Sequence, residues 1–168
     1  MMSPIILNAS IAICKKGNVT MYKHVMLPYD GSELSDRALN EGIAFAKNTG
    51  AKITLMYVVT PYHLPVGGDH GSDMVKEIEH RHAVEIEKQA NEMLERGRQR
   101  AEAAGVQCET IVRPGFHPHQ EIIETGKNRK CDLILMASHG RRGLQGLLLG
   151  SETVKVLTHC SIPVLVVR

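Results

Sequence analysis

Two stretches of the sequence carry residue types that suit the binding of an anion or a sugar. The first is PYDGS, residues 28–32, and the second is ASHGRRGLQGLLLGSE, residues 137–152. The second contains four glycines, at positions 140, 143, 146 and 150, and each would cost a helix interior roughly 1 kcal/mol relative to alanine. A purely structural segment has no need of so many, so we infer that another molecule requires close access to this backbone.

The residue types of the second stretch favour a phosphate site. Gly150 and Ser151 open an expected helix, whose first N–H groups lack internal partners and attract an anion together with the helix dipole. Arg141 and Arg142 add positive charge suited to phosphate oxygens, while the Ser151 hydroxyl either caps its own helix or bonds a phosphate. The alternative is a tight turn with close helix packing, and on residue types we favour the phosphate cradle.

Neither common nucleotide motif accompanies these residues. The sequence has no G-x-x-x-x-G-K-[ST], and no G-x-G-x-x-G follows the first expected strand, which argues against a P-loop enzyme and a dinucleotide-binding dehydrogenase. For Asp30 two interpretations stand equal: a ligand contact, or an Asx-turn closed through its own backbone. His139 either contacts phosphate or hydrogen-bonds within its loop, and we favour the loop.

The elements that would position these stretches alternate along the chain. Strands are expected at 24–30, 53–59, 106–112, 132–138 and 163–167, and helices after a cap at Ser32 or Ser35, over 75–104, 119–127 and 152–159. This alternation predicts an α/β fold with an open parallel sheet and helices on both faces. Residues 106–112 alternate in polarity, which indicates a strand at or near an edge. Ligands of such sheets bind beyond the carboxyl ends of strands, where both stretches lie.

The composition is that of one ordinary globular domain. The chain has 168 residues, of which 43% are hydrophobic and 23% charged, with a formal net charge of +2; this balance gives no reason to expect nucleic-acid binding. Four scattered cysteines without a C-x-x-C pair fit reduced thiols, and we interpret Cys108, Cys131 and Cys160 as core residues. We expect no metal site in the protein itself.

The two ends of the chain raise separate expectations. Residues 1–20 are expected to be a poorly ordered N-terminal extension, and residues 21–168 the folded domain. The apolar patch from Ile5 to Ile13 is too short to span a bilayer and lacks preceding positive charge, so we expect neither a membrane segment nor a secretory signal. At the other end, Pro163 to Val167 would form an apolar edge strand that needs a partner to cover it.

From about Tyr22 to Arg168 the sequence resembles the universal stress protein family of the A-like type. ATP-binding members carry G-x2-G-x9-G-[ST] after the fourth strand; here Gly140, Gly150 and Ser151 match it, and Ala137 replaces the first glycine. The resemblance implies a Rossmann-like, adenine nucleotide alpha hydrolase-like fold with strand order 3-2-1-4-5.

The resemblance also implies residue roles. It assigns Asp30 to the ribose hydroxyls, Pro28 to the adenine pocket and the backbone of Val58 to the adenine edge, and it sets the Ala137 methyl against the nucleoside. The expected contacts are then Pro28, Asp30, Val58, Ala137, His139, Gly140, Arg141, Arg142, Gly150, Ser151 and Glu152.

The function that follows is that of a cytoplasmic stress-response protein. We expect a homodimer, paired through Pro163 to Val167, that binds ATP with Mg²⁺ on its phosphates and acts as a regulatory or sensing module. One alternative is a slow ATPase or phosphotransferase, which needs carboxylates near the phosphates, where the sequence offers Asp30 and Glu152. The other is a nucleotide-free interaction protein, which Ala137 would favour.

Overall fold

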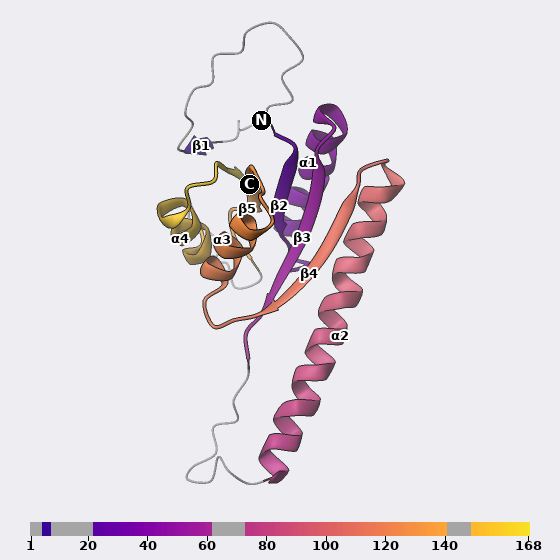
Figure 1. Cartoon of the computed structure of the whole chain (residues 1–168), viewed down its shortest axis with the longest axis vertical. Helices are drawn as coiled ribbons and strands as arrows, with labels where there is room; N and C mark the ends of the chain where they lie inside the picture. The colour runs from indigo at the N-terminus through magenta and orange to yellow at the C-terminus, as the bar shows by residue number, and fades with distance from the viewer. Residues whose placement is uncertain (1–4, 8–21, 62–72, 141–148) are drawn as a thin grey trace, which may run out of the picture.

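A mixed sheet forms the centre of the protein, as the computed structural model shows (Figure 1). The structure describes residues 5–7, 22–61, 73–140 and 149–168, with the backbone alone for 5–7. The strand order is β1-β6-β5-β2-β3-β4. The strands are β1 (Ile5–Leu7), β2 (His24–Pro28), β3 (Lys52–Val59), β4 (Cys108–Pro114), β5 (Leu133–Ala137) and β6 (Val164–Val167). Strands β2 to β6 are parallel, in the predicted order 3-2-1-4-5, and β4 lies at an edge as expected.

Helices cover both faces of this sheet. They are α1 (Glu33–Thr49), α2 (Asp73–Ala103), α3 (Pro118–Asn128) and α4 (Ser151–His159). The cap of α1 is Ser32, whose Oγ accepts a hydrogen bond from the Ser35 amide at 3.2 Å. Gly50 ends the helix with φ of 71°, a left-handed conformation that glycine adopts readily.

Two buried clusters lie on the two sides of the sheet. The cluster under α1 and α2 includes Leu27, Leu55 and Leu135, and the one under α3 and α4 includes Met26 and Ile134. Successive residues of a strand therefore enter opposite clusters, because side chains alternate across a sheet. Apolar neighbours on both faces explain the continuous apolar runs of the central strands. The expected core cysteines Cys108 and Cys131 are buried, and Cys160 is half-buried.

Helix α2 continues well past the sheet (Figure 1). The helix predicted over 75–104 is present, and its buried residues all lie in its second half: Ala90, Met93, Leu94, Gly97 and Ala101. Near its start, Met74 is 75% and Ile78 37% exposed. Periodicity predicted the helix correctly but could not show where its support by the sheet ends. None of the helices in the described ranges is long and apolar enough to cross a membrane.

Strand β1 is the element that the sequence did not predict. It lies within the expected N-terminal extension and pairs antiparallel with β6, with Ile5 opposite Val166 and Leu7 opposite Val164. Three residues are too few to show a strand periodicity. The C-terminal strand, expected to end the sheet, therefore has a neighbour from its own chain.

Candidate functional site

The loops after β2 and β5 meet at the carboxyl edge of the sheet. The two strands are parallel neighbours, paired through Val25–Leu133 and Met26–Ile134. A Cβ added to Gly140 would lie 2.6 Å from Asp30 Oδ2, closer than real Cβ contacts. The Asp30 carboxylate therefore lies directly against the main chain of Gly140, and the structure brings these two predicted site residues together.

The Asp30 carboxylate is held in place by Ser32. Its Oδ1 accepts hydrogen bonds from the Ser32 amide at 3.0 Å and the Ser32 hydroxyl at 2.6 Å. This is the Asx-turn that we considered for Asp30. The turn uses Oδ1, whereas Oδ2 is the atom nearest the Gly140 position. The two interpretations of Asp30 are therefore compatible, since each involves a different oxygen.

Tyr29 braces the same loop from the other side. Its hydroxyl donates to Asp36 Oδ1 at 2.8 Å, and Arg100 pairs with that carboxylate. Burial raises the pKa of Tyr29 to about 12. Burial alone would also raise the pKa of Asp36, but hydrogen bonds from Arg100 and Tyr29 outweigh it and hold this pKa below its usual value. Asp30 thus projects from a loop fixed to both α1 and α2.

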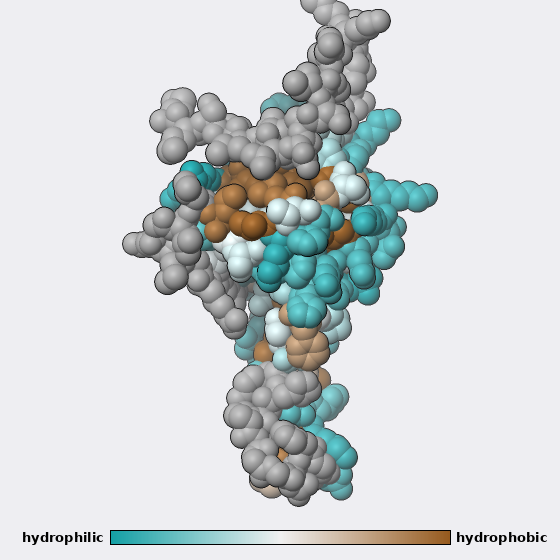
Figure 2. All heavy atoms as spheres, turned by 90° about the vertical axis from the view of Figure 1, so that its left-hand side faces the viewer, coloured by the Kyte–Doolittle hydropathy of each residue, from teal (hydrophilic) through white to brown (hydrophobic). Residues whose placement is uncertain are grey.

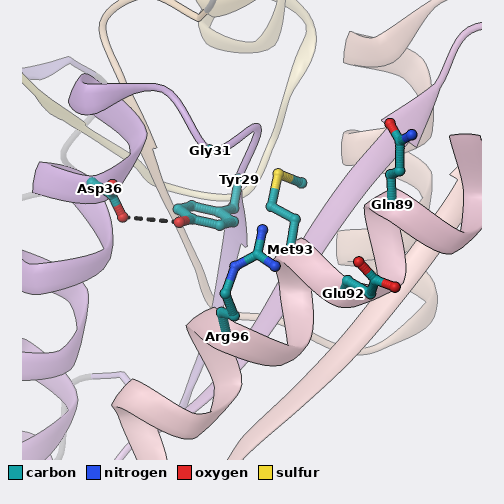
Figure 3. A pocket seen from close by; sticks show the side chains of 7 residues that line it. All are labelled: Tyr29, Gly31, Asp36, Gln89, Glu92, Met93 and Arg96. Atoms are coloured by element: carbon teal, nitrogen blue, oxygen red, sulfur yellow. Dashed lines mark hydrogen bonds between the residues drawn. The ribbon is translucent and has the colours of Figure 1, made fainter.

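A hollow of 410 Å³ lies between this loop and α2 (Figure 3). Its walls are Tyr29, Gly31, Asp36, Gln89, Glu92, Met93 and Arg96. Neither Gly140 nor Gly150 is among them, so the hollow lies on the α2 side of the loop. It is distinct from the edge where Asp30 meets Gly140.

The start of α4 is packed tightly against the end of β5. The Gly150 amide donates to the Ser138 carbonyl at 2.7 Å, and the Thr153 hydroxyl is 3.1 Å from the carbonyls of both Ala137 and Ser138. A Cβ on Gly150 would lie only 3.2 Å from the Ser138 carbonyl oxygen. We expected the amides at the Gly150–Ser151 turn to face an anion; that of Gly150 itself is used internally.

The free donors of α4 begin one residue later. Gly150 is the N-cap and offers no side-chain cap. Within the described residues, the amides of Ser151, Glu152 and Thr153 have no acceptor, as is usual for the first turn of a helix. Together with the helix dipole they form a positive end. This end is suited to an anion next to Gly140 and Asp30.

His139 adds a second unsatisfied group beside Gly150. Its Nδ1 is 3.2 Å from the Ser138 hydroxyl, so the predicted hydrogen bond within the loop is present. Its Nε2 is buried and has no partner in the part of the chain that the structure describes. A buried polar atom without a partner is rare and calls for a ligand or water.

Glu152 makes its bonds on the α3 side. Its Oε2 accepts from the backbone amide of His119 at 2.9 Å and lies 3.0 Å from His119 Nδ1, while Lys155 bonds Oε1 at 2.7 Å. Burial alone would raise the pKa of Glu152, but the hydrogen bonds from Lys155 and His119 lower it. The carboxylate thus accepts the hydrogen bond of a backbone amide in the first turn of α3. The sequence could not show this role, because His119 is distant from Glu152 along the chain.

The remaining predicted residues differ in how close they come to this edge. Pro28 ends β2, and Val58 lies near the end of β3 beside the α3/α4 cluster. Ala137 ends β5, is 7% exposed, and belongs to the cluster under α1 and α2. Arg141 and Arg142 lie outside the described residues. In the described ranges no group of three or more His, Cys, Asp or Glu is placed to hold a metal ion.

The fold and this edge define a class of protein: a Rossmann-like α/β protein in which a helix N-terminus and a carboxylate lie at the carboxyl edge of the sheet. Residues 21–168 match the model of the universal stress protein family, and the chain belongs to that family.

Relatives in archaea and bacteria match over most of this chain. It is similar to universal stress protein MJ0531 of Methanocaldococcus jannaschii, at 33% identity over 88% of this chain and 83% of the relative. It is also similar to universal stress protein YxiE of Bacillus subtilis, at 32% identity over 88% of this chain and 100% of the relative. The solved structure of MJ0577, again from M. jannaschii, is 30% identical, with a TM-score of 0.74 over 88% of this chain and 96% of that one.

Proposed function

We propose that this protein binds an adenine nucleotide, ATP foremost, as a regulatory or sensing module of the cytoplasmic stress response. The observation that carries the proposal is the contact of Asp30 with Gly140, near the first-turn amides of α4 from Ser151 onward, which have no acceptor among the described residues. Asp30 Oδ2 would accept hydrogen bonds from the ribose hydroxyls. The amides of α4, with Arg141 and Arg142, would bind the phosphates.

The base would lie along the carboxyl ends of β2 and β3. Pro28 and Val58 stand there and are both half-buried, with the apolar cluster that contains Met26 and Met56 beside Val58. An apolar wall of this kind suits the face of a purine.

A buried histidine nitrogen of the site supports a bound phosphate group. The Nε2 of His139 lies beside Gly150 and has no partner among the described residues, and it would gain one from a phosphate oxygen. The lack of a Cβ at Gly140 and Gly150 lets their main chain lie close to Asp30 Oδ2 and to the Ser138 carbonyl oxygen, which keeps the parts of the site together. Mg²⁺ would arrive on the phosphates and neutralise part of their charge.

Two further members of the family have been solved with adenine nucleotides. One is a universal stress protein in complex with cAMP, 24% identical, and the other is the protein from Archaeoglobus fulgidus in complex with dAMP, 17% identical. At these identities the likeness to this chain rests on the fold. The choice of an adenine nucleotide therefore depends on the residues of this chain.

The carboxylates favour binding over turnover. Phosphoryl transfer requires groups that hold the metal or orient the attacking water. Asp30 Oδ1 is bonded to Ser32, and both oxygens of Glu152 are bonded to His119 and Lys155. A slow ATPase remains the alternative, and it would need Asp30 Oδ2 to serve water rather than ribose.

The position of Ala137 bears on the nucleotide-free alternative. Its methyl belongs to the buried cluster under α1 and α2. This position supports the view that the methyl group does not occupy the space proposed for the nucleotide. We therefore favour a nucleotide-binding protein over an interaction protein without nucleotide.

We further propose a homodimer through β6. Val164 and Val166 are buried in this strand, and only the three residues of β1 lie beyond it in the sheet. A short apolar strand with so small a neighbour invites pairing with a second copy.

Calorimetric titration with ATP, ADP and AMP tests the binding function. We expect one nucleotide per chain and an affinity that rises with the number of phosphates, because the added charges meet the amides of α4. Absence of heat at millimolar ATP, with no nucleotide in the mass spectrum of the purified protein, would favour the nucleotide-free alternative. Repeated phosphate release that Gly140→Val abolishes would instead indicate an ATPase.

A further inference from the structure

The outer edge of β6 presents the backbone groups of alternate residues. The amides of Ile134 and Ser138 donate to the carbonyls of Pro163 and Val167, at 2.9 and 2.7 Å. Because backbone groups alternate in direction along a strand, Val164 and Val166 direct theirs away from β5. These are the groups that any strand added to this edge must pair with.

Strand β1 lies opposite those same groups. Its register sets Leu7 against Val164 and Ile5 against Val166, with Ile6 opposite Leu165. The amides of Leu7 and Ile5 therefore face β6, while that of Ile6 faces outward. A second copy of the chain that used this edge would need the groups that β1 already occupies.

We propose that β1 is an intramolecular cover that competes with a second copy of the chain for the edge of β6. This inference rests on the proposed dimer through β6. When β1 is paired, the edge is satisfied within one chain; when β1 is released, the edge is open to a partner strand. Dimerisation then requires displacement of β1.

The length and attachment of β1 suit a displaceable cover. Residues 8–23 join it to β2, so its pairing is intramolecular, and short tethers give effective concentrations on the order of millimolar. The contact itself is brief, with three register pairs against a strand of four residues. Such a contact prevails over pairing with a second copy at low protein concentration and is displaced by it as the concentration rises.

The surroundings of the edge favour a second copy as the competitor. Figure 2, which faces the left-hand side of Figure 1, where β1 and α4 lie, shows hydrophobic surface gathered on this side of the molecule. On that helix Val154 is 42% exposed. Apolar surface beside an edge strand would be buried by a like surface in a two-fold pair.

The free-energy cost of releasing β1 applies to each of the two copies in a dimer, because both must open their β6 edge. If the cover is in place in roughly nine of ten chains, about one pair in a hundred presents two open edges. The apparent dimer Kd then rises about a hundredfold.

Two proline variants of the full chain test this competition. Leu7→Pro removes an amide that faces β6, whereas Ile6→Pro removes one that faces outward, where an edge strand tolerates proline. By sedimentation equilibrium we expect Leu7→Pro to lower the dimer Kd by about a hundredfold, the full penalty estimated above, and Ile6→Pro to leave it within about threefold.

Amide hydrogen exchange in dilute protein supplies the second measurement. In the original chain and in Ile6→Pro, the amides of Val164 and Val166 should exchange slowly; in Leu7→Pro they should exchange fast. Equal exchange in all three chains would overturn the cover. Weaker dimerisation of Leu7→Pro would overturn it as well, since it would show that β1 is exchanged between copies.

The same data separate this inference from the dimer on which it rests. Slow exchange at Val164 and Val166, together with a monomer at every protein concentration, would show that β1 pairs with β6 but that no second copy competes for this edge. That result would refute both the competition and the proposed dimer. A dimer of unchanged Kd in Leu7→Pro would keep the dimer and refute the competition.

Discussion

The contact between Asp30 and Gly140 is the residue-scale feature on which the proposed nucleotide binding depends. In Gly140→Val, a Cβ would lie within 2.6 Å of Asp30 Oδ2 and would displace the carboxylate from the sugar. We expect ATP affinity to fall by about a hundredfold or more, as for a lost pair of charged hydrogen bonds. Calorimetric titration measures the change.

Gly105→Ala is the matched control for that variant. Gly105 has φ of 81° and no atom within 4 Å of the Cβ position, so alanine there strains the backbone without a clash. We expect about 1 kcal/mol lower stability and unchanged ATP affinity. If Gly140→Val and Gly105→Ala alter ATP affinity alike, the loss in Gly140→Val reflects stability rather than the site.

Ala137 tests whether the replaced motif glycine restricts the nucleotide. Because its side chain is 7% exposed and belongs to the core, Ala137→Gly should lower the free energy of unfolding by roughly 0.5–1 kcal/mol. ATP affinity should stay within about threefold. Urea unfolding and titration measure the two quantities, and a gain in affinity of tenfold or more would identify the methyl as an obstacle.

At this scale the sequence predicted that Asp30 and Gly140 face each other, but not most of the contacts around them. The types and spacing of Asp30, Gly140 and Gly150 pointed to one edge of the sheet, and two of them proved adjacent. The roles of Thr153 and Glu152 were missed, because their partners are carbonyls of a packed strand end and a residue of another helix. Only three-dimensional packing defines such partners.

Between elements, a buried histidine joins β2 to β3. His24 Nε2 is 2.7 Å from the Thr54 hydroxyl, and both side chains are buried. Burial lowers the pKa of His24 below 6.5, with the nearby charge of Lys52 acting in the same direction. The folded chain therefore binds this proton less readily than the unfolded chain.

The stability of the protein should consequently fall as the pH drops below 6.5. In that range the unfolded chain gains a proton on His24 that the folded chain does not take up, so acid favours unfolding. Denaturant titrations between pH 7.5 and 5 should show a decline that His24→Gln lacks. Equal pH profiles for both chains would show that His24 does not contribute.

Helix α2 packs on the sheet through a glycine. A Cβ on Gly97 would lie 2.8 Å from Leu55 Cδ1 and 3.4 Å from Leu39 Cδ2, both fully buried. Gly97→Val should therefore lower the free energy of unfolding by about 1–3 kcal/mol through overpacking.

Ala83→Val on the exposed part of the same helix is the control. We expect it to change the free energy of unfolding by no more than about 0.5 kcal/mol. Urea unfolding compares the two, and equal effects would contradict the packing of α2 on Leu55.

The elements themselves were largely predictable. Apolar runs such as 53–59 and the stop at Gly50 set strands and helices within a few residues of their observed bounds. Strand β1 was not, since three apolar residues carry no period and pair with a strand at the far end of the chain. The extension of α2 beyond the sheet was not predictable either, because periodicity identifies the apolar face of a helix but not the elements that cover that face.

For the whole molecule, the β-α alternation predicted the parallel sheet, whereas the strand order came from the family resemblance. Local sequence does not encode which strands become neighbours. That order sets β2 beside β5, and so brings residue 30 to residue 140. A site made of two distant loops therefore follows from the topology.

Backbone amide chemical shifts during an ATP titration test the central claim most directly. We expect the largest changes at Gly140 and at Ser151 to Thr153, with Asp30 responding as the ribose binds. Changes confined to the hollow between Tyr29 and Arg96, or none at saturating ATP, would contradict a nucleotide site at this edge.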